Sequence, residues 1–288
     1  MSRALIDALN KLVAAQGSLA SSQLSTAQRL ALNEFAQQTG IVAQRLQGRG
    51  SMYVVINQTQ LVQYLHVLQP IQSEQAHTLP KRTANLALYR NSKSQAHQHD
   101  WYYVLIKAIT GQDVVWQHQQ KTLALTQLTQ LAGCASIMIH HQDDWYSSQP
   151  LWLVENQALF DDLSWLPAEA TGTVLYYAGH IHGVLLDWLA KQLRCSELIL
   201  FADYDGVGLS NYVRLCERLE QQVQFWLMPN WPQKLLQMGN RELWLKNRPL
   251  FDASVAKLTN LKAIKPIASL IEAMRHSALA LEQEAVFL

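Results

Sequence analysis

Short, mostly apolar segments alternate with amphipathic segments across the second half of the chain. The apolar segments are LWLVE (151–155), TVLYY (173–177), LILFA (198–202) and QVQFWLM (222–228). Between the second and third of them, apolar residues recur at helical spacing, at Ile181, Val184, Leu185, Trp188 and Leu189. Short apolar strands alternating with amphipathic helices are typical of a parallel sheet covered by helices on both faces. We therefore predict an α/β fold here, followed by a closing helix at about Pro266–Ala280.

The first 70 residues carry a different pattern, of short helices followed by a strand. One helix is expected over about residues 26–38 and a second, shorter one at Val42–Leu46. A glycine turn then leads into a strand at Met52–Ile56. This is the order of a winged helix-turn-helix domain, in which Arg45 and Arg49 would lie on the second helix and the wing and contact DNA. The alternative is a small helical domain with a hairpin and no DNA contact.

Residues 71–150 begin with a polar stretch that is rich in basic residues. The basic residues that could line one helix face and contact phosphates are Arg82, Arg90 and Lys93. The same spacing also fits a solvated helix surface. A buried apolar run (101–109) and an amphipathic helix at Leu123–Leu131 follow. We therefore divide the chain into a winged-helix-like domain (1–70), a helical adapter and DNA-contact region (71–150) and an α/β domain (151–288).

Acidic residues follow two of the predicted strands. Glu155 ends the first strand of the α/β domain, and Asp203 and Asp205 come directly after the third. Reactive groups in open parallel sheets gather beyond the carboxyl ends of the strands, so these three side chains are expected to converge. Carboxylates without basic partners repel one another, and a divalent cation relieves that repulsion. Hard oxygen ligands suit Mg²⁺ or Mn²⁺, whereas the alternative is a loop whose carboxylates cap a helix.

Four further polar residues lie near the predicted carboxylate site. Asn156 could hydrogen-bond a metal-bound water or a phosphate, and His180 and His182 could contact phosphate or move a proton. The histidines fit equally well as polar surface at a helix start. Arg214 could reach a phosphate or pair with a glutamate on its own helix.

The motifs around these residues resemble a known fold. Residues 151–228 are similar to the Toprim fold of topoisomerases, primases and several nucleases, in which a strand-terminal Glu and a later Asp-x-Asp bind the catalytic metal; the corresponding residues here are Glu155, Asp203 and Asp205. More narrowly, LWLVENQALF, YYAGHIHGVLLDWL and LILFADYDGVGLSNYVRL look like the Toprim module of bacterial Wadjet nuclease subunits. Those subunits are related to the A subunit of topoisomerase VI, act beside condensin-like SMC complexes and cut invading plasmid DNA.

The resemblance implies a metal-dependent DNA endonuclease, with a Toprim catalytic domain at 151–288 that hydrolyses phosphodiester bonds by metal-activated water. It implies double-stranded plasmid DNA as the substrate, SMC and kleisin-type subunits as partners, and a role in plasmid or phage defence in the bacterial cytoplasm, at the nucleoid. A second copy of the chain is a further candidate partner, and no membrane is expected.

Three competing functions remain open. One is a topoisomerase-type strand breaker with a tyrosine nucleophile, for which the candidates are Tyr53, Tyr102 and Tyr103. Another is a Toprim enzyme acting on RNA, or a primase. The last is a non-catalytic DNA-binding or scaffold subunit, against which the intact acidic set counts.

Charge and composition sharpen this picture. The 288 residues carry a formal net charge of +1, and charged residues make up 16%, against roughly 25% in typical soluble domains. The first 150 residues hold 11 Lys and Arg against 7 Asp and Glu, whereas the rest hold 12 against 15. A mildly basic half for positioning DNA is thus joined to an acidic half for metal, and the low charge content favours an enzyme that partners bring to its substrate. The three widely spaced cysteines indicate a reduced compartment rather than disulfides or zinc.

Overall fold

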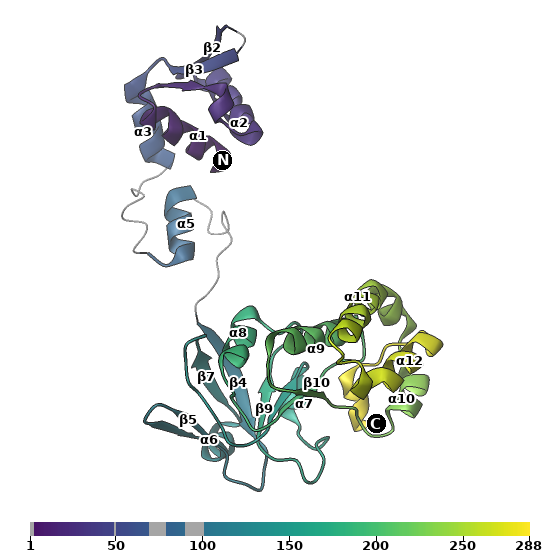
Figure 1. Ribbon diagram of the computed structural model, residues 1–288. Helices are drawn as coiled ribbons and strands as arrows, with labels where there is room; N and C mark the ends of the chain where they lie inside the picture. Colours follow the sequence, from purple (N-terminus) through teal and green to yellow (C-terminus); the bar gives the residue numbers. More distant parts are fainter. Residues whose placement is uncertain (1–2, 49, 69–78, 90–100) are drawn as a thin grey trace. The chain divides into compact units, whose positions relative to one another are not determined.

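The computed structural model describes residues 3–48, 50–68, 79–89 and 101–288, and the chain divides into two units, Met1–Gln98 and His99–Leu288 (Figure 1). This division replaces the expected boundaries after residues 70 and 150. Residues 102–150 lie with the second unit because two of their strands belong to its central sheet. No helix among the described residues is long and apolar enough to cross a membrane.

The first unit combines helices with a small antiparallel sheet of strand order β1-β3-β2. Its elements are α1 (Arg3–Ala14), β1 (Ser18–Ala20), η1 (Ser21–Gln23), α2 (Thr26–Thr39), β2 (Val42–Gln47), β3 (Gly50–Val55), α3 (Gln58–Leu68) and α5 (Lys81–Tyr89). The apolar faces of α1, α2 and α3 bury Leu9, Leu32 and Leu61 completely in one core cluster, which also contains Tyr53 of β3. The expected helix at 26–38 is confirmed; its N-cap is Ser25, whose side chain accepts the Gln28 amide in a capping box.

The second short helix expected at Val42–Leu46 is wrong, because this segment is strand β2. Gly40 ends α2 in the left-handed conformation, and β2 then pairs with β3 in a hairpin in which Arg45 lies opposite Met52. Pairing satisfies the backbone along six residues, which are too few to stabilise an isolated helix. Arg45 is therefore on the hairpin, exposed to solvent, and Arg49 lies outside the described residues.

The second unit is built around a six-stranded mixed sheet of order β11-β10-β8-β9-β4-β7. Its strands are β4 (Tyr102–Ala108), β7 (Ala135–Ile139), β8 (Leu151–Val154), β9 (Thr173–Tyr176), β10 (Leu198–Phe201) and β11 (Val223–Phe225). The four strands from β8 to β11 are parallel, as their apolar segments predicted, and β4 and β7 extend the sheet antiparallel. The α/β class is thus confirmed.

The described part of region 71–150, expected to be a helical adapter, holds strands as well as helices. Besides α5, β4 and β7 it contains the hairpin β5 (Val115–His118) and β6 (Lys121–Ala124), and helix α6 (Leu125–Ala132). The apolar run at 101–109 was expected to be buried, but along β4 buried and exposed side chains alternate, with Val104 and Ile106 facing the core. This period of two is that of a strand with one covered face.

Helices cover the sheet and extend beyond its β11 edge, where α10, α11 and α12 gather (Figure 1). The helices are α7 (Gln157–Asp161), α8 (Gly183–Lys191), α9 (Gly206–Arg218), α10 (Trp231–Met238), α11 (Arg241–Asn260) and α12 (Ala268–Ser277), with η2 (Lys265–Ile267) and η3 (Gln283–Phe287). The predicted closing helix corresponds to η2 and α12. Leu153, Leu175 and Leu200, from three neighbouring strands, are fully buried in the core.

The strand order places one crevice of this sheet between β8 and β10. The chain leaves β8 for β9 on one side and later returns to β10 on the other side, so the two neighbouring strands send their following loops in opposite directions. In open parallel sheets, ligands bind at the carboxyl ends of the strands where the order reverses in this way. Glu155 follows β8 and Asp203 follows β10, so both lie at this switch point.

Two glycines let α9 start close to its neighbours. A Cβ atom at Gly208 would lie 2.0 Å from the Asp203 carbonyl oxygen, and one at Gly206 would lie 2.4 Å from the Asn247 carbonyl oxygen. Both obstacles are backbone atoms, so the loop after β10 would have to shift to accept a larger side chain.

We expect Gly208→Ala to destabilise the protein by about 1–3 kcal/mol or more, because the added methyl overpacks the loop that carries Asp203. Gly183→Ala is the matched control, since a Cβ at this first position of α8 meets nothing within 4 Å. Urea unfolding of both variants measures the difference. Equal unfolding midpoints would show that the close approach at Gly208 is not a constraint.

Candidate active site

The ends of β8 and β10 bring two carboxylates together. Phe201 pairs with Val154 in register, so Glu155 and Asp203 follow neighbouring positions of adjacent parallel strands. The backbone amide of Asp203 donates a hydrogen bond to the Glu155 carboxylate, and the Tyr177 hydroxyl donates to its Oε2 at 3.2 Å. Glu155 is only 6% exposed. The convergence of Glu155 and Asp203 follows from the strand order.

Burial and mutual repulsion shift the titration of both carboxyl groups. Burial, with the negative charges of Asp203 and Asp205, raises the pKa of Glu155 to about 8. Burial also raises the pKa of Asp203 to about 7; the Gln283 amide opposes this rise, and the charges of Asp205, Glu284 and Glu282 add to it. Among the ion pairs between described residues, none involves either carboxylate. Such unpaired buried carboxyls are unfavourable for folding and concentrate at functional sites.

Asp205 lies beside this pair but is engaged differently. It is the N-cap of α9, where its Oδ1 accepts the Gly208 amide at 2.8 Å and its Oδ2 accepts Nδ2 of Asn247 at 2.7 Å. These contacts are those of the helix-capping alternative. Burial raises the pKa of Asp205, and its hydrogen bonds and His180 oppose the rise. That Asp205 shares a cation with Glu155 and Asp203 stays a prediction.

A C-terminal segment completes the surroundings of the carboxylates, and sequence reasoning missed it. Nδ2 of Asn156 donates to Oδ1 of Asp203 at 3.2 Å and to Oε2 of Glu284 at 3.1 Å. The Gln283 amide donates to the same Asp203 oxygen at 2.8 Å. Tyr177 and Asn247 were also not predicted. Gln283 and Glu284 lie some 80 residues from Asp203 along the chain, so no local pattern could have connected them.

The loop after β9 carries the two predicted histidines. Ala178 and Gly179 both adopt positive φ, and the fully buried Asn211 holds the loop by donating to the Gly179 carbonyl and accepting the Ile181 amide. His182 caps α8 through Nδ1, which accepts the Val184 amide at 3.2 Å. This contact agrees with the alternative interpretation of His182, as a polar residue at the start of a helix.

The remaining predicted residues fall in several places. The His182 ring stacks on Tyr102 at 4.4 Å between centroids. Arg214 is half-buried on α9, where burial and Arg218 lower its pKa, while Glu217 pairs with Lys257. Arg82 is exposed on α5, and Arg90 and Lys93 lie outside the described residues.

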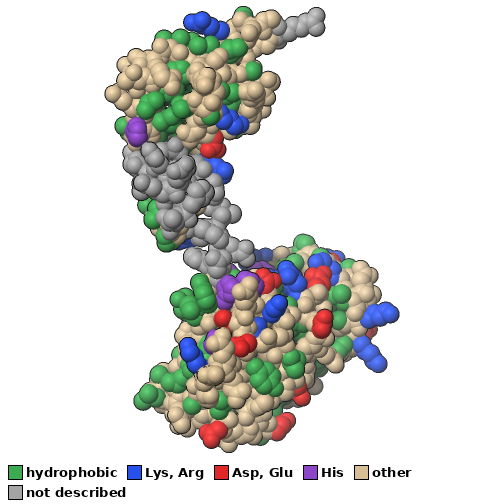
Figure 2. All heavy atoms as spheres, turned by 60° about the vertical axis from the view of Figure 1, so that its left-hand side comes forward, with side chains coloured by type: hydrophobic (Ala, Val, Ile, Leu, Met, Phe, Trp, Pro, Cys, Tyr) green, Lys and Arg blue, Asp and Glu red, His purple; other side chains and the backbone are tan. Residues whose placement is uncertain are grey.

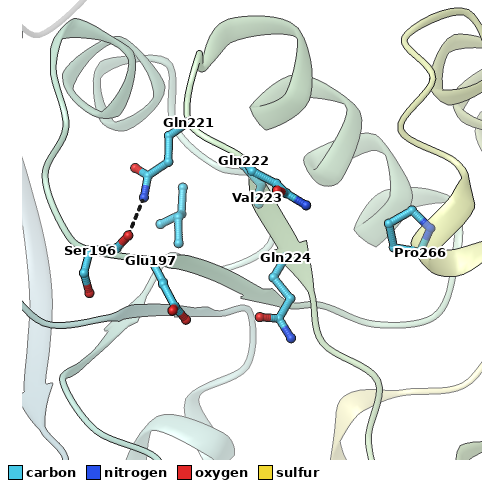
Figure 3. Close-up of a pocket in the computed structure, with 8 residues that line it drawn as sticks. Ser196, Glu197, Gln221, Gln222, Val223, Gln224 and Pro266 are labelled. Carbon is cyan, nitrogen blue, oxygen red and sulfur yellow. Dashed lines mark hydrogen bonds between the residues drawn. The ribbon is translucent and has the colours of Figure 1, made fainter.

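A groove elsewhere on the second unit lacks this chemistry. It lies at the opposite, amino-terminal end of β10 and β11, and is lined by Ser196, Glu197, Leu198, Gln221, Gln222, Val223, Gln224 and Pro266 (Figure 3). Nε2 of Gln221 donates to the Ser196 carbonyl across it. None of the predicted site residues lines this groove, so the carboxylate pair remains the candidate site.

The donor set at the switch point fits a small hard cation. Among the described residues, no group of three or more His, Cys, Asp or Glu is arranged to hold a metal ion. Mg²⁺, however, is commonly held by one or two carboxylates, with water and substrate phosphate completing its shell. Glu155 and Asp203 supply such a pair, and a cation there would offset the burial and the neighbouring negative charges that raise their pKa values.

Fold and site together define an α/β protein with a buried carboxylate pair at the switch point of its parallel strands. The family described as "Domain of unknown function (DUF7281)" matches residues 102–288, and the chain belongs to this family. The match begins at the first residue of β4, so it includes the two antiparallel strands of the sheet. No curated protein matches the chain.

We expect Glu155→Gln to stabilise the cation-free protein, and increasingly so as pH rises. In the unfolded chain Glu155 ionises near its ordinary pKa of 4.5, whereas in the fold its pKa is about 8. The cost of the buried charge is therefore absent below about pH 4.5, grows as pH rises through this interval and is complete above about pH 8. At pH 8 the variant should gain on the order of a few kcal/mol.

Thermal melting in EDTA between pH 5 and 8 measures this gain. Glu197→Gln, at an exposed position on the other end of the sheet, is the charge-matched control and should leave the pH dependence unchanged. If the Tm of Glu155→Gln changes with pH in parallel with that of the wild type, ionisation of Glu155 does not destabilise the fold.

Proposed function

We propose that this protein is a metal-dependent DNA endonuclease of the Toprim type. The observation that carries the proposal is the pair of buried carboxylates, Glu155 and Asp203, at the switch point between β8 and β10, with no Lys or Arg paired to either among the described residues. A Glu after the first parallel strand and an Asp-x-Asp after the third is also the arrangement that the Toprim resemblance implies. Mg²⁺ or Mn²⁺ on this pair supplies charge stabilisation and a more acidic bound water for phosphodiester hydrolysis.

The chain's own groups orient the pair for this role. Asn156 and the Gln283 amide fix Oδ1 of Asp203, and Tyr177 fixes Glu155. These donors are neutral, so they hold the carboxylates without cancelling the charge that attracts a cation. Asp205 and Asn247 hold the start of α9 directly beside the pair.

The first unit supports a role in DNA binding. Its order α1, β1, η1, α2, β2, β3 agrees with a winged helix, in which the β2–β3 hairpin is the wing and presents the exposed Arg45. In Figure 2 the basic side chains on the visible face of this unit lie apart from one another. On the sequence resemblance, we further propose that SMC and kleisin-type subunits bring the protein to plasmid DNA. The low charge content of the chain favours such recruitment over strong binding by the protein alone.

We expect the wild type to cleave plasmid DNA with Mn²⁺ or Mg²⁺, and Glu155→Gln and Asp203→Asn each to lose about a hundredfold or more of the rate. Each substitution removes a carboxylate ligand of the cation that would stabilise charge on the reacting phosphate. Glu197→Gln is the control that removes the same charge from the opposite end of the sheet. A gel assay of supercoiled, nicked and linear plasmid measures all four proteins, with and without the SMC and kleisin-type subunits. Cleavage that survives both site substitutions would contradict the assignment.

The same assay separates hydrolysis from the competing functions. A tyrosine strand breaker leaves protein covalently joined to DNA ends, which denaturing gels detect, whereas hydrolysis does not. Tyr53 is buried and donates to Oδ1 of Asn33 at 2.6 Å, which does not suit a nucleophile. Tyr102 stacks on His182 at the start of α8, so Tyr102→Phe, which retains the ring, is the informative variant and should keep the cleavage rate. RNA cleavage or nucleotide incorporation would instead indicate an RNA-directed enzyme or a primase, and complete inactivity would favour a scaffold subunit.

We expect Arg45→Ala to weaken DNA binding uniformly across sequences and to lower the slope of log K against log salt by about 1, because one phosphate contact is lost. Arg3→Ala is the control, since Arg3 is an exposed arginine on α1 that pairs with Asp7. Fluorescence anisotropy with labelled duplex between 50 and 200 mM salt, roughly the range over which such contacts are lost, measures both variants. An unchanged slope for Arg45→Ala would remove the hairpin from the DNA interface.

A further inference from the structure

One neutral side chain joins the two strand ends that carry the carboxylates. Gln283 is fully buried, although it begins the short η3 near the C-terminus. Just before it, Leu281 forms an antiparallel bridge with Tyr204, through amide-to-carbonyl bonds of 2.8 and 3.1 Å. This bridge places Gln283 alongside the loop that follows β10.

Gln283 makes three hydrogen bonds there, and each reaches a different part of the site. Its Nε2 donates to the carbonyl of Phe201, the last residue of β10. Its Oε1 accepts the amide of Asn156, the residue after Glu155, at 3.1 Å. Its backbone amide donates to Oδ1 of Asp203 at 2.8 Å. One residue thus ties the loop of Glu155 to the strand end of Asp203.

We propose that Gln283 is a positioning residue of the active site, which keeps Glu155 and Asp203 at the separation that a divalent cation requires. This inference rests on the proposed function. The two loops carry like charges and tend to move apart. A primary amide supplies both the donor for Phe201 and the acceptor for Asn156, as an uncharged residue.

Other side chains would not serve this purpose. A lysine at 283 would pair with the carboxylates and displace the cation, and a glutamate would add a further negative charge and lose the donor to Phe201. The segment that follows Gln283 is also held in place, because Nζ of Lys234 on α10 donates to the carbonyls of Ala285 at 2.8 Å and Val286 at 3.1 Å. Gln283 is therefore held in place before any cation binds.

The test uses Gln283→Met in the full chain, because methionine has nearly the same length but no donor and only a weakly accepting sulfur. We expect its Kd for Mn²⁺, measured from the electron paramagnetic resonance of free Mn²⁺, to rise about ten- to hundredfold, as is typical when residues that orient metal ligands are lost. The control is Thr173→Val, which removes the buried bond from Nε1 of Trp116 at the other end of the sheet. Its Mn²⁺ affinity should equal that of the wild type.

A second measurement needs no cation. If the side chain of Gln283 holds the two carboxylates together, they can move apart in Gln283→Met. Glu155→Gln then relieves less repulsion in that background. We expect the gain in Tm from Glu155→Gln, measured in EDTA at pH 8, to fall in the Gln283→Met background by the share that repulsion contributes, and to persist unchanged in the Thr173→Val background.

The outcomes separate this inference from the proposed function. A wild type that binds Mn²⁺ no better than Glu155→Gln overturns the proposed metal site, and the Tm comparison still decides the role of Gln283. If the wild type binds Mn²⁺ and Gln283→Met binds it equally well, the positioning role is overturned. The same holds if Glu155→Gln raises the Tm by the same amount with and without Gln283→Met. A raised Kd with a reduced Tm gain supports both proposals.

Discussion

The site depends on the repulsion between two carboxylates that the sheet forces together. Adjacent parallel strands lie about 4.8 Å apart, so side chains just beyond the ends of β8 and β10 have little room to separate. Glu155 is the first residue after β8 and Asp203 is the second after β10, and burial is the largest cost to their charges. The sheet itself cannot relax, because its central strands are apolar on both faces and fully buried. A rigid core therefore maintains an unfavourable charge pair at its edge.

The groups around the pair donate hydrogen bonds to the two carboxylates but do not neutralise their charge. Asn156, Tyr177 and Gln283 provide neutral donors, whereas basic residues of the same unit pair elsewhere, as Lys257 does with Glu217 and Arg218 with Asp187. A lysine or arginine beside the pair would compensate the buried charges more fully than amides do. Neutral hydrogen bonds leave the negative potential in place, and this is what a cation site needs.

The sequence was informative where signals are local. Four apolar segments predicted the parallel strands, and the switch-point rule then placed Glu155 beside Asp203. Local patterns failed where the partners are distant. The sequence of β2 predicted a helix, but its pairing with β3 makes it a strand. In the same way, β4 joins the sheet by pairing with β9, about 70 residues later. Gln283 reaches Asn156 across 127 positions, which no periodicity encodes. For Asp205 the same motif suits a helix cap and a metal ligand, so the sequence left both open.

The balance of stability and charge also weighs against a purely structural scaffold. A protein that only binds or bridges partners gains nothing from two buried carboxyls whose pKa values lie near 7 and 8, because substitution by amides would remove the repulsion and keep the hydrogen-bonded shape. The nearby Glu282 and Glu284 deepen the negative potential rather than relieve it. Such an edge repels a phosphate backbone unless a cation lies between them. On the proposed function, this pair would supply part of a ligand shell, and a divalent ion with the substrate phosphate would complete it.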